Sequence, residues 1–232
     1  MTSCSYVKAA VETVKDLLAE DGRELKTGKR PHKGPLPHGY KPELDVTDEC
    51  DAEHMSRFQQ LIGILRWAVE LGRIDIQTEV ALLSQYQASP REGHLEGLYL
   101  IFHFLSKNPK KRLVMDPNYP AVDESTFNTD AEWMEFYGDV REEDSPGMPE
   151  PLGQPVMQTA FVDSDHAGDS ITQRSRMGFI IYLNSAPIYW MSKKQGSIST
   201  STFASEYDAM KNCCEYIRGL RYKLRMMGVP LS

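Results

Sequence analysis

A-F-V-D-S-D-H-A-G-D, at residues 160–169, is the stretch on which the interpretation of the fold rests, because a short apolar run opens onto three acids there. Two further runs follow, G-F-I-I-Y-L at 178–183 and P-I-Y-W-M at 187–191, both rich in β-branched and aromatic residues. Such runs favour strands, and the link Asn184-Ser185-Ala186 between them is typical of a turn. We expect three antiparallel strands, at 159–164, 177–184 and 186–192.

A long helix is predicted after these strands, from near 202 to 227. Its sequence begins at Thr202, a residue type that caps helix N-termini. A strand bearing Asp163 and a helix that begins with Glu206 can bring these two carboxylates to one end of a sheet. Apolar residues spaced by three and four positions predict a buried stripe along the helix: Met210, Cys213, Ile217, Leu220 and Leu224.

Converging carboxylates have a specific chemical use. Mg²⁺ prefers oxygen ligands, and a two-ion site about 3.5–4 Å across can hold both oxygens of an in-line phosphoryl displacement. Asp163 and Glu206 suit such a site. The alternative is that the acids of this region are solvated, with Asp165 and Asp169 near a turn and Glu206 stabilised by the helix dipole.

Four motifs lie between residues 160 and 228: F-V-D-S-D-H-A-G-D at 161–169, Arg174-Ser175 before Gly178-Phe179-Ile180, W-M-S-K-K-Q at 190–195 and S-T-S-T-F-A-S-E-Y at 199–207. Together they resemble the ribonuclease H domain of copia-type retrotransposon polyproteins. The resemblance implies Mg²⁺-dependent hydrolysis of RNA in RNA–DNA hybrids, with Asp163 and Glu206 as the catalytic and metal-binding residues. The middle of the chain resembles the family segment between the polymerase palm and that domain.

Composition is that of an ordinary globular chain of one large or two small domains: 232 residues, 41% hydrophobic and 25% charged. The net charge of −7 argues against nucleic-acid binding through the whole surface, although local basic patches can still contact phosphates. No apolar run approaches the roughly 18 residues of a membrane span, and the N-terminus lacks a secretory signal pattern. We therefore expect no membrane partner and an intracellular location, cytoplasmic or nuclear.

The N-terminal half is predicted to be mainly helical. One amphipathic helix is expected at 5–18, and three more between 51 and 106. The first of these three is expected to stop at Gly72, the second to cover 74–86 and the third 94–105, and Gly228 is expected to end the last helix of the chain. Arg73 and Asp75 could be mistaken for a catalytic pair, but a structural ion pair or a helix cap is the preferred interpretation. An edge strand or hairpin is expected at 110–120.

The predicted fold class is α+β: a helical N-terminal and middle layer, then an incomplete ribonuclease H-like α/β unit of three antiparallel strands and one long helix. An acidic run followed by a Pro/Gly cluster indicates an exposed linker between them. The predicted divisions are an N-terminal helix with a basic Pro/Gly-rich linker at 1–50, a helical connection region of a reverse transcriptase at 51–120, the acidic linker at 121–155 and the truncated ribonuclease H-like domain at 156–232.

Two features of the family have no counterpart in this sequence. It contains no Tyr-x-Asp-Asp tetrad, so we expect no polymerase activity. The family domain continues past its long helix with a strand bearing a third acid, for which no match is found. We therefore expect a polyprotein fragment that does not cleave RNA–DNA hybrids by itself. The alternative is a non-catalytic remnant that binds nucleic acid or protein at most, and that self-associates through the unpaired edge of the strand bearing Asp163.

Overall fold

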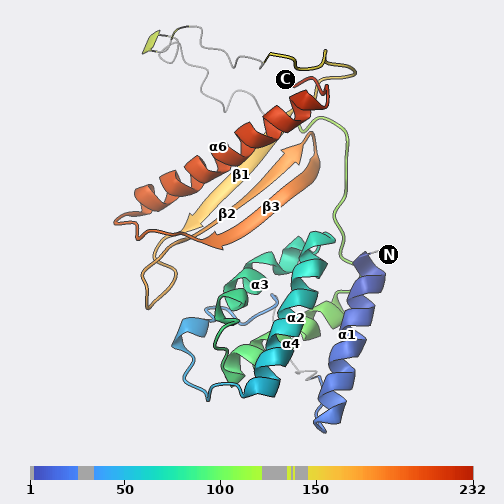
Figure 1. The fold of residues 1–232 in the computed structure, drawn as a ribbon, viewed down its shortest axis with the longest axis vertical. Helices are drawn as coiled ribbons and strands as arrows, with labels where there is room; N and C mark the ends of the chain where they lie inside the picture. The colour runs from blue at the N-terminus through green and yellow to red at the C-terminus, as the bar shows by residue number, and fades with distance from the viewer. Residues whose placement is uncertain (1–2, 26–33, 122–134, 137, 139–145, 232) are drawn as a thin grey trace. The chain divides into compact units, whose positions relative to one another are not determined.

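The computed structural model describes residues 3–25, 34–121, 135–136, 138 and 146–231 (Figure 1). It is a mixed α and β structure, as predicted, with a three-stranded antiparallel sheet. Most of the predicted linker at 121–155 lies outside the described residues. The elements are α1 (Ser3–Glu20), η1 (Pro42–Leu44), α2 (Ala52–Glu70), η2 (Ile74–Ile76), α3 (Gln77–Leu83), η3 (Ser84–Tyr86), α4 (Glu92–Lys107), β1 (Gln158–Asp165), β2 (Arg176–Leu183), β3 (Ala186–Lys194) and α6 (Thr202–Met226).

Two compact units make up the chain, and the division between them runs through the sheet. The first consists of Met1–Val114, Val162–Phe179 and Trp190–Met210, and the second of Met115–Phe161, Ile180–Tyr189 and Lys211–Ser232. The domain boundaries proposed from composition stay a prediction.

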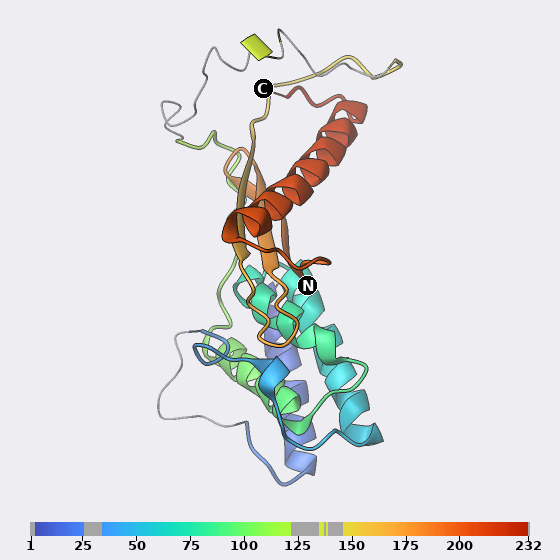
Figure 2. The same ribbon diagram turned by 90° about the vertical axis from the view of Figure 1, so that its left-hand side faces the viewer.

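Helices α1 to α4 enclose the main hydrophobic core of the first unit, and α1, α2 and α4 lie side by side in Figures 1 and 2. The helices form because apolar residues recur at helical spacing and meet across this core, as Phe58, Leu61, Ile62 and Leu65 do on α2. Chain reversal after α2 requires Gly72, whose φ is +98°, a value that disfavours any residue with a Cβ. The predicted end of this helix is therefore confirmed.

The segment 74–86 was expected to form one helix, but it is built as a short α-helix, α3, with a 3₁₀ turn on either side. Two β-branched residues, Ile74 and Ile76, fill the entry turn and disfavour a regular α-helical start. At the other end, the hydroxyl of Ser84 donates to the carbonyl of Val80 at 2.6 Å, which competes with continued helix.

Arg73 and Asp75 form a partly buried ion pair, so the structural interpretation of these residues is confirmed. The guanidinium donates from Nε to Oδ1 at 2.8 Å and from Nη2 to Oδ2 at 2.9 Å. The Arg73 side chain is fully buried. A planar guanidinium that meets a carboxylate through two parallel bonds is a strong pairing geometry.

The strand or hairpin expected at 110–120 is absent, because residues 108–121 contain neither helix nor strand. Pro109, Pro117 and Pro120 remove three backbone donors from the segment. Asp116 closes a local turn by accepting from the backbone N–H and the amide of Asn118 at 3.0 and 2.8 Å. Residues 112–115, R-L-V-M, have a propensity for strand but pair with no other strand among the described residues.

The predicted strands are confirmed within two residues, and their order in the sheet is β1-β2-β3. The turn between β2 and β3 is held by Asn184, which has a left-handed φ of +52° that Asn tolerates. Its side-chain oxygen accepts from the Met157 N–H at 2.9 Å, and its amide donates to the Pro117 carbonyl at 2.7 Å. One side chain thus joins the hairpin to the start of β1.

The long helix α6 begins and ends where expected, but its cap and part of its buried face differ from prediction. Ser201, not Thr202, is the capping residue, since its hydroxyl accepts from the Ala204 N–H at 3.1 Å. Met210 is 47% exposed, because the face toward the sheet carries Ala209 and Cys213 instead. Gly228, at φ +72°, closes the C-terminal end.

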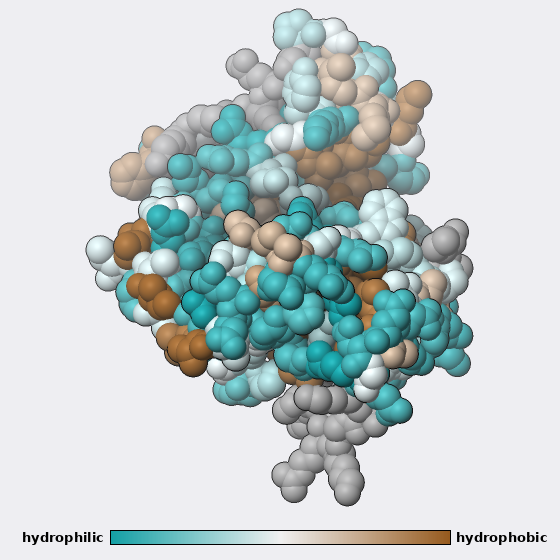
Figure 3. Space-filling view, turned by 60° about the horizontal axis from the view of Figure 1, so that its bottom comes forward, coloured by the Kyte–Doolittle hydropathy of each residue, from teal (hydrophilic) through white to brown (hydrophobic). Residues whose placement is uncertain are grey.

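Hydrophobic surface is limited on the face drawn in Figure 3, which is mainly hydrophilic with hydrophobic side chains in a few small groups. Among the described residues, no helix combines the length and the apolar character that a membrane crossing requires.

Candidate functional site

Two sequence-predicted site residues lie on adjacent elements, Asp163 in β1 and Glu206 in α6. Asp163 is exposed and Glu206 is partly buried. Glu206 is the fifth residue of α6 and therefore lies just past the first turn, where the sequence had suggested the first turn itself. That the two carboxylates converge on one cation stays a prediction.

Hydrogen bonds between chain neighbours of these acids join the two elements. The hydroxyl of Ser164 donates to the hydroxyl of Ser205 at 3.0 Å, and the Ser205 hydroxyl donates in turn to the Thr202 carbonyl at 2.7 Å. The amide of Gln195 donates to the Ser205 carbonyl at 2.9 Å. Ser205 and Gln195 are almost completely buried, so these bonds form in a low-dielectric setting. We call Ser164, Gln195 and Ser205 the polar tether.

The polar tether also determines which way Asp163 faces. Successive side chains of a strand point to opposite faces, and Ser164 faces α6. Asp163 therefore lies on the opposite face of β1. A cation shared by Asp163 and Glu206 would have to lie beside β1, at the edge of the sheet, rather than between the sheet and the helix.

Sequence reasoning missed the polar tether. A signal was present in the sequence. Ser164 lies between two acids, Asp163 and Asp165, and Ser205 directly precedes Glu206. Serine at these positions fits many roles in isolation. Only the packing of α6 on the sheet shows that the two hydroxyls are partners.

The other two acids of the motif, Asp165 at the end of β1 and Asp169 in the loop after it, are held in local structure. Asp169 accepts from the Thr172 N–H at 2.7 Å and from the Ile171 N–H at 3.1 Å, and it forms an ion pair with Lys194 at the end of β3. Asp165 lies over Gly168, where a Cβ would come within 2.0 Å of its Oδ2 atom. These contacts identify Asp169 as a structural acid, which agrees with its predicted position near a turn.

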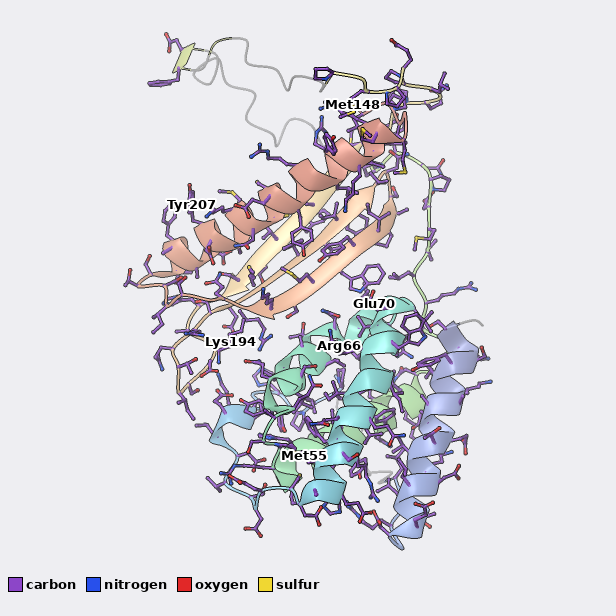
Figure 4. The ribbon with its side chains drawn as sticks, in the orientation of Figure 1. Met55, Arg66, Glu70, Met148, Lys194 and Tyr207 are labelled. Carbon is purple, nitrogen blue, oxygen red and sulfur yellow. The ribbon has the colours of Figure 1, made fainter. Side chains whose placement is uncertain are left out.

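Electrostatics separate Asp169 from the other acids of the region. Burial raises the pKa of its carboxyl, but the hydrogen bonds from Lys194 and Thr172 outweigh burial and lower the pKa to about 2. Lys194 is labelled in Figure 4, at the end of β3. Asp169 therefore stays ionised under all ordinary conditions.

Replacing Lys194 with Met is expected to raise the pKa of Asp169 from about 2 toward its ordinary value, because only the hydrogen bonds of Thr172 then oppose the effect of burial. A folded-state pKa below the unfolded value stabilises the fold above about pH 4, and this contribution is lost as the pH falls toward 2. The variant should therefore lose stability near neutral pH and depend less on acid pH. NMR titration of the Asp169 carboxyl and denaturation at pH 3 and 7 measure both effects.

Lys193→Met is the matched control, since Lys193 is exposed and is the immediate neighbour. An Asp169 pKa that stays near 2 in Lys194→Met would show that the ion pair does not hold the carboxyl ionised.

Metal-ligating side chains are sparse around this site. Within residues 3–25, 34–121, 135–136, 138 and 146–231, no group of three or more His, Cys, Asp or Glu side chains is placed to hold a metal ion. Asp163 and Glu206 remain a candidate pair of oxygen ligands. Their donor chemistry fits a hard divalent cation, which takes carboxylate oxygens in preference to nitrogen or sulfur.

The Retrovirus-related Pol polyprotein from transposon RE1 of Arabidopsis thaliana is 24% identical over 196 residues, which is 84% of this chain and 11% of that protein. The chain is similar to retrotransposon polyproteins. The polyprotein from transposon RE2 of the same plant is 22% identical over an equal share, and a transposon Ty5-1 protein of Saccharomyces cerevisiae is 23% identical over 168 residues, 72% of this chain and 43% of that protein.

The resemblance seen in the motifs is therefore confirmed by retrotransposon relatives that match most of the chain. The chain spans only about a tenth of the two plant polyproteins. No protein-family model matches the sequence, and no solved structure matches it significantly.

Proposed function

We propose that this chain comprises the ribonuclease H-like part of a retrotransposon polyprotein with the helical connection region that precedes it, and that Asp163 and Glu206 bind Mg²⁺ there. One observation carries the proposal: an antiparallel β1-β2-β3 sheet followed by α6, with β1 joined to the start of α6 directly beside both acids. The similarity to Pol polyproteins supports the assignment to a retroelement.

The roles follow from the chemistry of the residues. Asp163 and Glu206 would supply the carboxylate oxygens, and Mg²⁺ when bound would supply positive charge for phosphoryl transfer. The polar tether holds the two acid-bearing elements together through buried hydrogen bonds, so Ser164, Gln195 and Ser205 act as positioning residues. Precise placement of ligands depends on such supporting contacts.

The nucleic-acid partner proposed for this site is an RNA–DNA hybrid. Lys211 and Arg218 are exposed on α6 and suit contact with phosphates. Lys223 and Arg225 lie in the last turn, where cations are also stabilised by the negative end of the helix dipole. Their position therefore does not by itself indicate contact with phosphates. Contacts with phosphates release counterions, and binding should therefore weaken steeply as salt rises.

Paramagnetic NMR with Mn²⁺ in place of Mg²⁺ tests the metal site on the 232-residue chain. Backbone signals around residues 163 and 206 should broaden first. The broadening should disappear in Asp163→Asn and in Glu206→Gln, and persist in Glu215→Gln, which changes an exposed acid on the same helix. Broadening that is centred elsewhere, or that both variants retain, would rule out the proposed ligands.

A non-catalytic binding module is the second candidate, and it is favoured by the lack of a third carboxylate beside this pair among the described residues. Two carboxylates hold Mg²⁺ weakly, and positioning two ions for cleavage usually takes more ligands. We therefore expect the chain alone to bind a labelled RNA–DNA hybrid without cleaving it. Cleavage by the wild-type chain that Asp163→Asn abolishes would instead make this chain an active nuclease.

A further inference from the structure

A groove of about 480 Å³ lies in the first compact unit, between α2, α3 and η3 on one side and the adjoining ends of β2 and β3 on the other. Its lining residues all belong to that unit. Within the same unit, the Ser170 N–H donates to Glu43 Oε1 at 2.9 Å, and Trp190 of β3 packs against the hydrophobic core of the helices. Packing within the first unit therefore forms the groove.

Positive charge predominates in this groove, although the chain as a whole carries a net charge of −7. Five charged residues line it: Arg66, Glu70, Arg176, Lys193 and Lys194. Figure 4 labels Arg66 and Glu70 on α2 and Lys194 at the end of β3. Lys194 is neutralised by its ion pair with Asp169. The side chains of the other three cations form no hydrogen bond or ion pair with any described residue, and Glu70 is the one acid that lines the groove with them.

Arg176, the first residue of β2, is the cation that most needs a partner. Its side chain is partly buried, and burial lowers the pKa of its guanidinium. The carboxylates of Asp165, Asp169 and Glu43 oppose this effect by their charge, but they line a separate cavity of about 140 Å³ that Arg176 also borders. A cation partly removed from water without a hydrogen-bonded partner is costly, so an anion in the groove would supply a stabilising contact.

A phosphate group is the ligand chemistry that fits these side chains. The planar guanidinium donates to two phosphate oxygens at once, and a lysine adds a compact charge. Gln77 and Ser192 contribute an amide and a hydroxyl to the lining, which are groups that contact phosphate and sugar oxygens in nucleic-acid complexes. A strand carries a phosphate at each nucleotide, so it can meet several of these cations, whereas a single carboxylate cannot.

We propose that this groove binds the phosphate groups of a nucleic-acid strand, with Arg176 contacting one phosphate and Arg66 and Lys193 flanking it. The proposal rests on the retroelement function proposed above. It adds a phosphate site that needs no metal ion and shares no residue with the pair Asp163 and Glu206. A free phosphate compound has the same chemistry, and competition experiments separate the two sources.

Fluorescence anisotropy of a labelled RNA–DNA hybrid, measured in EDTA so that no metal ion contributes, tests the groove on the 232-residue chain. Arg176→Gln should weaken binding by at least about tenfold, because it removes a charge-assisted contact. The slope of log K against log salt should fall in magnitude by about one. Lys8→Gln changes an exposed cation of α1 that does not line the groove, and it should alter neither quantity.

A second variant guards against misfolding of Arg176→Gln. Arg66→Glu with Lys193→Glu changes two exposed side chains, so it should keep the wild-type circular dichroism spectrum and still weaken hybrid binding at least as much. Inorganic phosphate should displace the hybrid only at millimolar concentration, since one ion replaces several contacts. Displacement at micromolar concentration would support the phosphate site but assign it to a free phosphate compound.

Two outcomes would overturn the proposal. One is hybrid binding by both groove variants that equals that of Lys8→Gln. The other is displacement of the hybrid by polyglutamate as effectively as by an unlabelled hybrid of matched charge, which would indicate a site for acidic peptides. The Mn²⁺-induced broadening around residues 163 and 206 should persist in Arg176→Gln, so failure of this groove and failure of the metal site are distinguishable.

Discussion

Asp75→Asn is expected to lower the free energy of unfolding by about 3–5 kcal/mol, since it leaves a fully buried guanidinium without its counter-charge. Burial raises the pKa of Asp75, but the hydrogen bonds and charge of Arg73 outweigh it, so the pKa lies below its ordinary value. The carboxylate is thus ionised and takes both bonds from Arg73. Arg73 Nη1 already lacks a hydrogen-bond partner among the described residues. Loss of the two bonds to Asp75 would therefore add further unsatisfied buried donors on the same guanidinium.

Urea denaturation followed by far-UV circular dichroism measures this loss, with Asp16→Asn as the matched control. Asp16 is an exposed acid of α1, and its replacement should change stability by no more than about 0.5 kcal/mol. The double variant Arg73→Met/Asp75→Leu should recover much of the loss, because removing both charges leaves no uncompensated ion. A loss below about 1 kcal/mol for Asp75→Asn would mean that Arg73 finds water or another partner.

Phe102→Ala is expected to destabilise the helical core by about 3–5 kcal/mol. Phe102 is completely buried in α4, and its neighbours Ile101 and Leu98 are completely buried too. Removing the ring loses its transfer free energy and leaves a cavity that close-packed helices collapse into only partly. The effect should be among the largest of any single apolar substitution in the chain.

Thermal and urea unfolding measure this effect against two reference variants. Phe102→Leu keeps much of the buried volume and should cost distinctly less. Phe203→Ala removes the same side chain from a position that is 78% exposed, and it should change stability by about 0.5 kcal/mol or less. Equal losses for Phe102→Ala and Phe203→Ala would contradict the assignment of the core to α1–α4.

Exposed aromatics on α6 belong to a different class from those of this core. Tyr207 lies on the side of α6 turned away from the sheet (Figure 4) and is more than half exposed. Its position directly after Glu206 made it part of the motif in the sequence, yet it contributes little to packing. Motif membership and burial are therefore separate properties along this helix.

Local sequence patterns were sufficient to predict a helix or a strand wherever one pattern dominated a segment. Short apolar runs, rich in β-branched and aromatic residues in β2 and β3, placed the three strands, and helical spacing of apolar residues placed α1, α2, α4 and α6. Gly72 and Gly228 marked helix ends because their left-handed backbone disfavours other residues. The pairing of Arg73 with Asp75 followed from their two-residue spacing and opposite charge. At the α6 cap the sequence pointed to Thr202, which was wrong, because its neighbour Ser201 is of a type that caps equally well and makes the bond.

Tertiary structure decided the rest, because those features depend on contacts between distant residues. Strand propensity at 110–120 found no pairing partner, and Met210 faced outward although its spacing also fitted a buried stripe. The sequence named Asp163 and Glu206 as the candidate acids, but only packing showed that Ser164 and Ser205 join their elements. Side chains 41 residues apart meet because α6 packs back onto the sheet, and no local pattern encodes that contact.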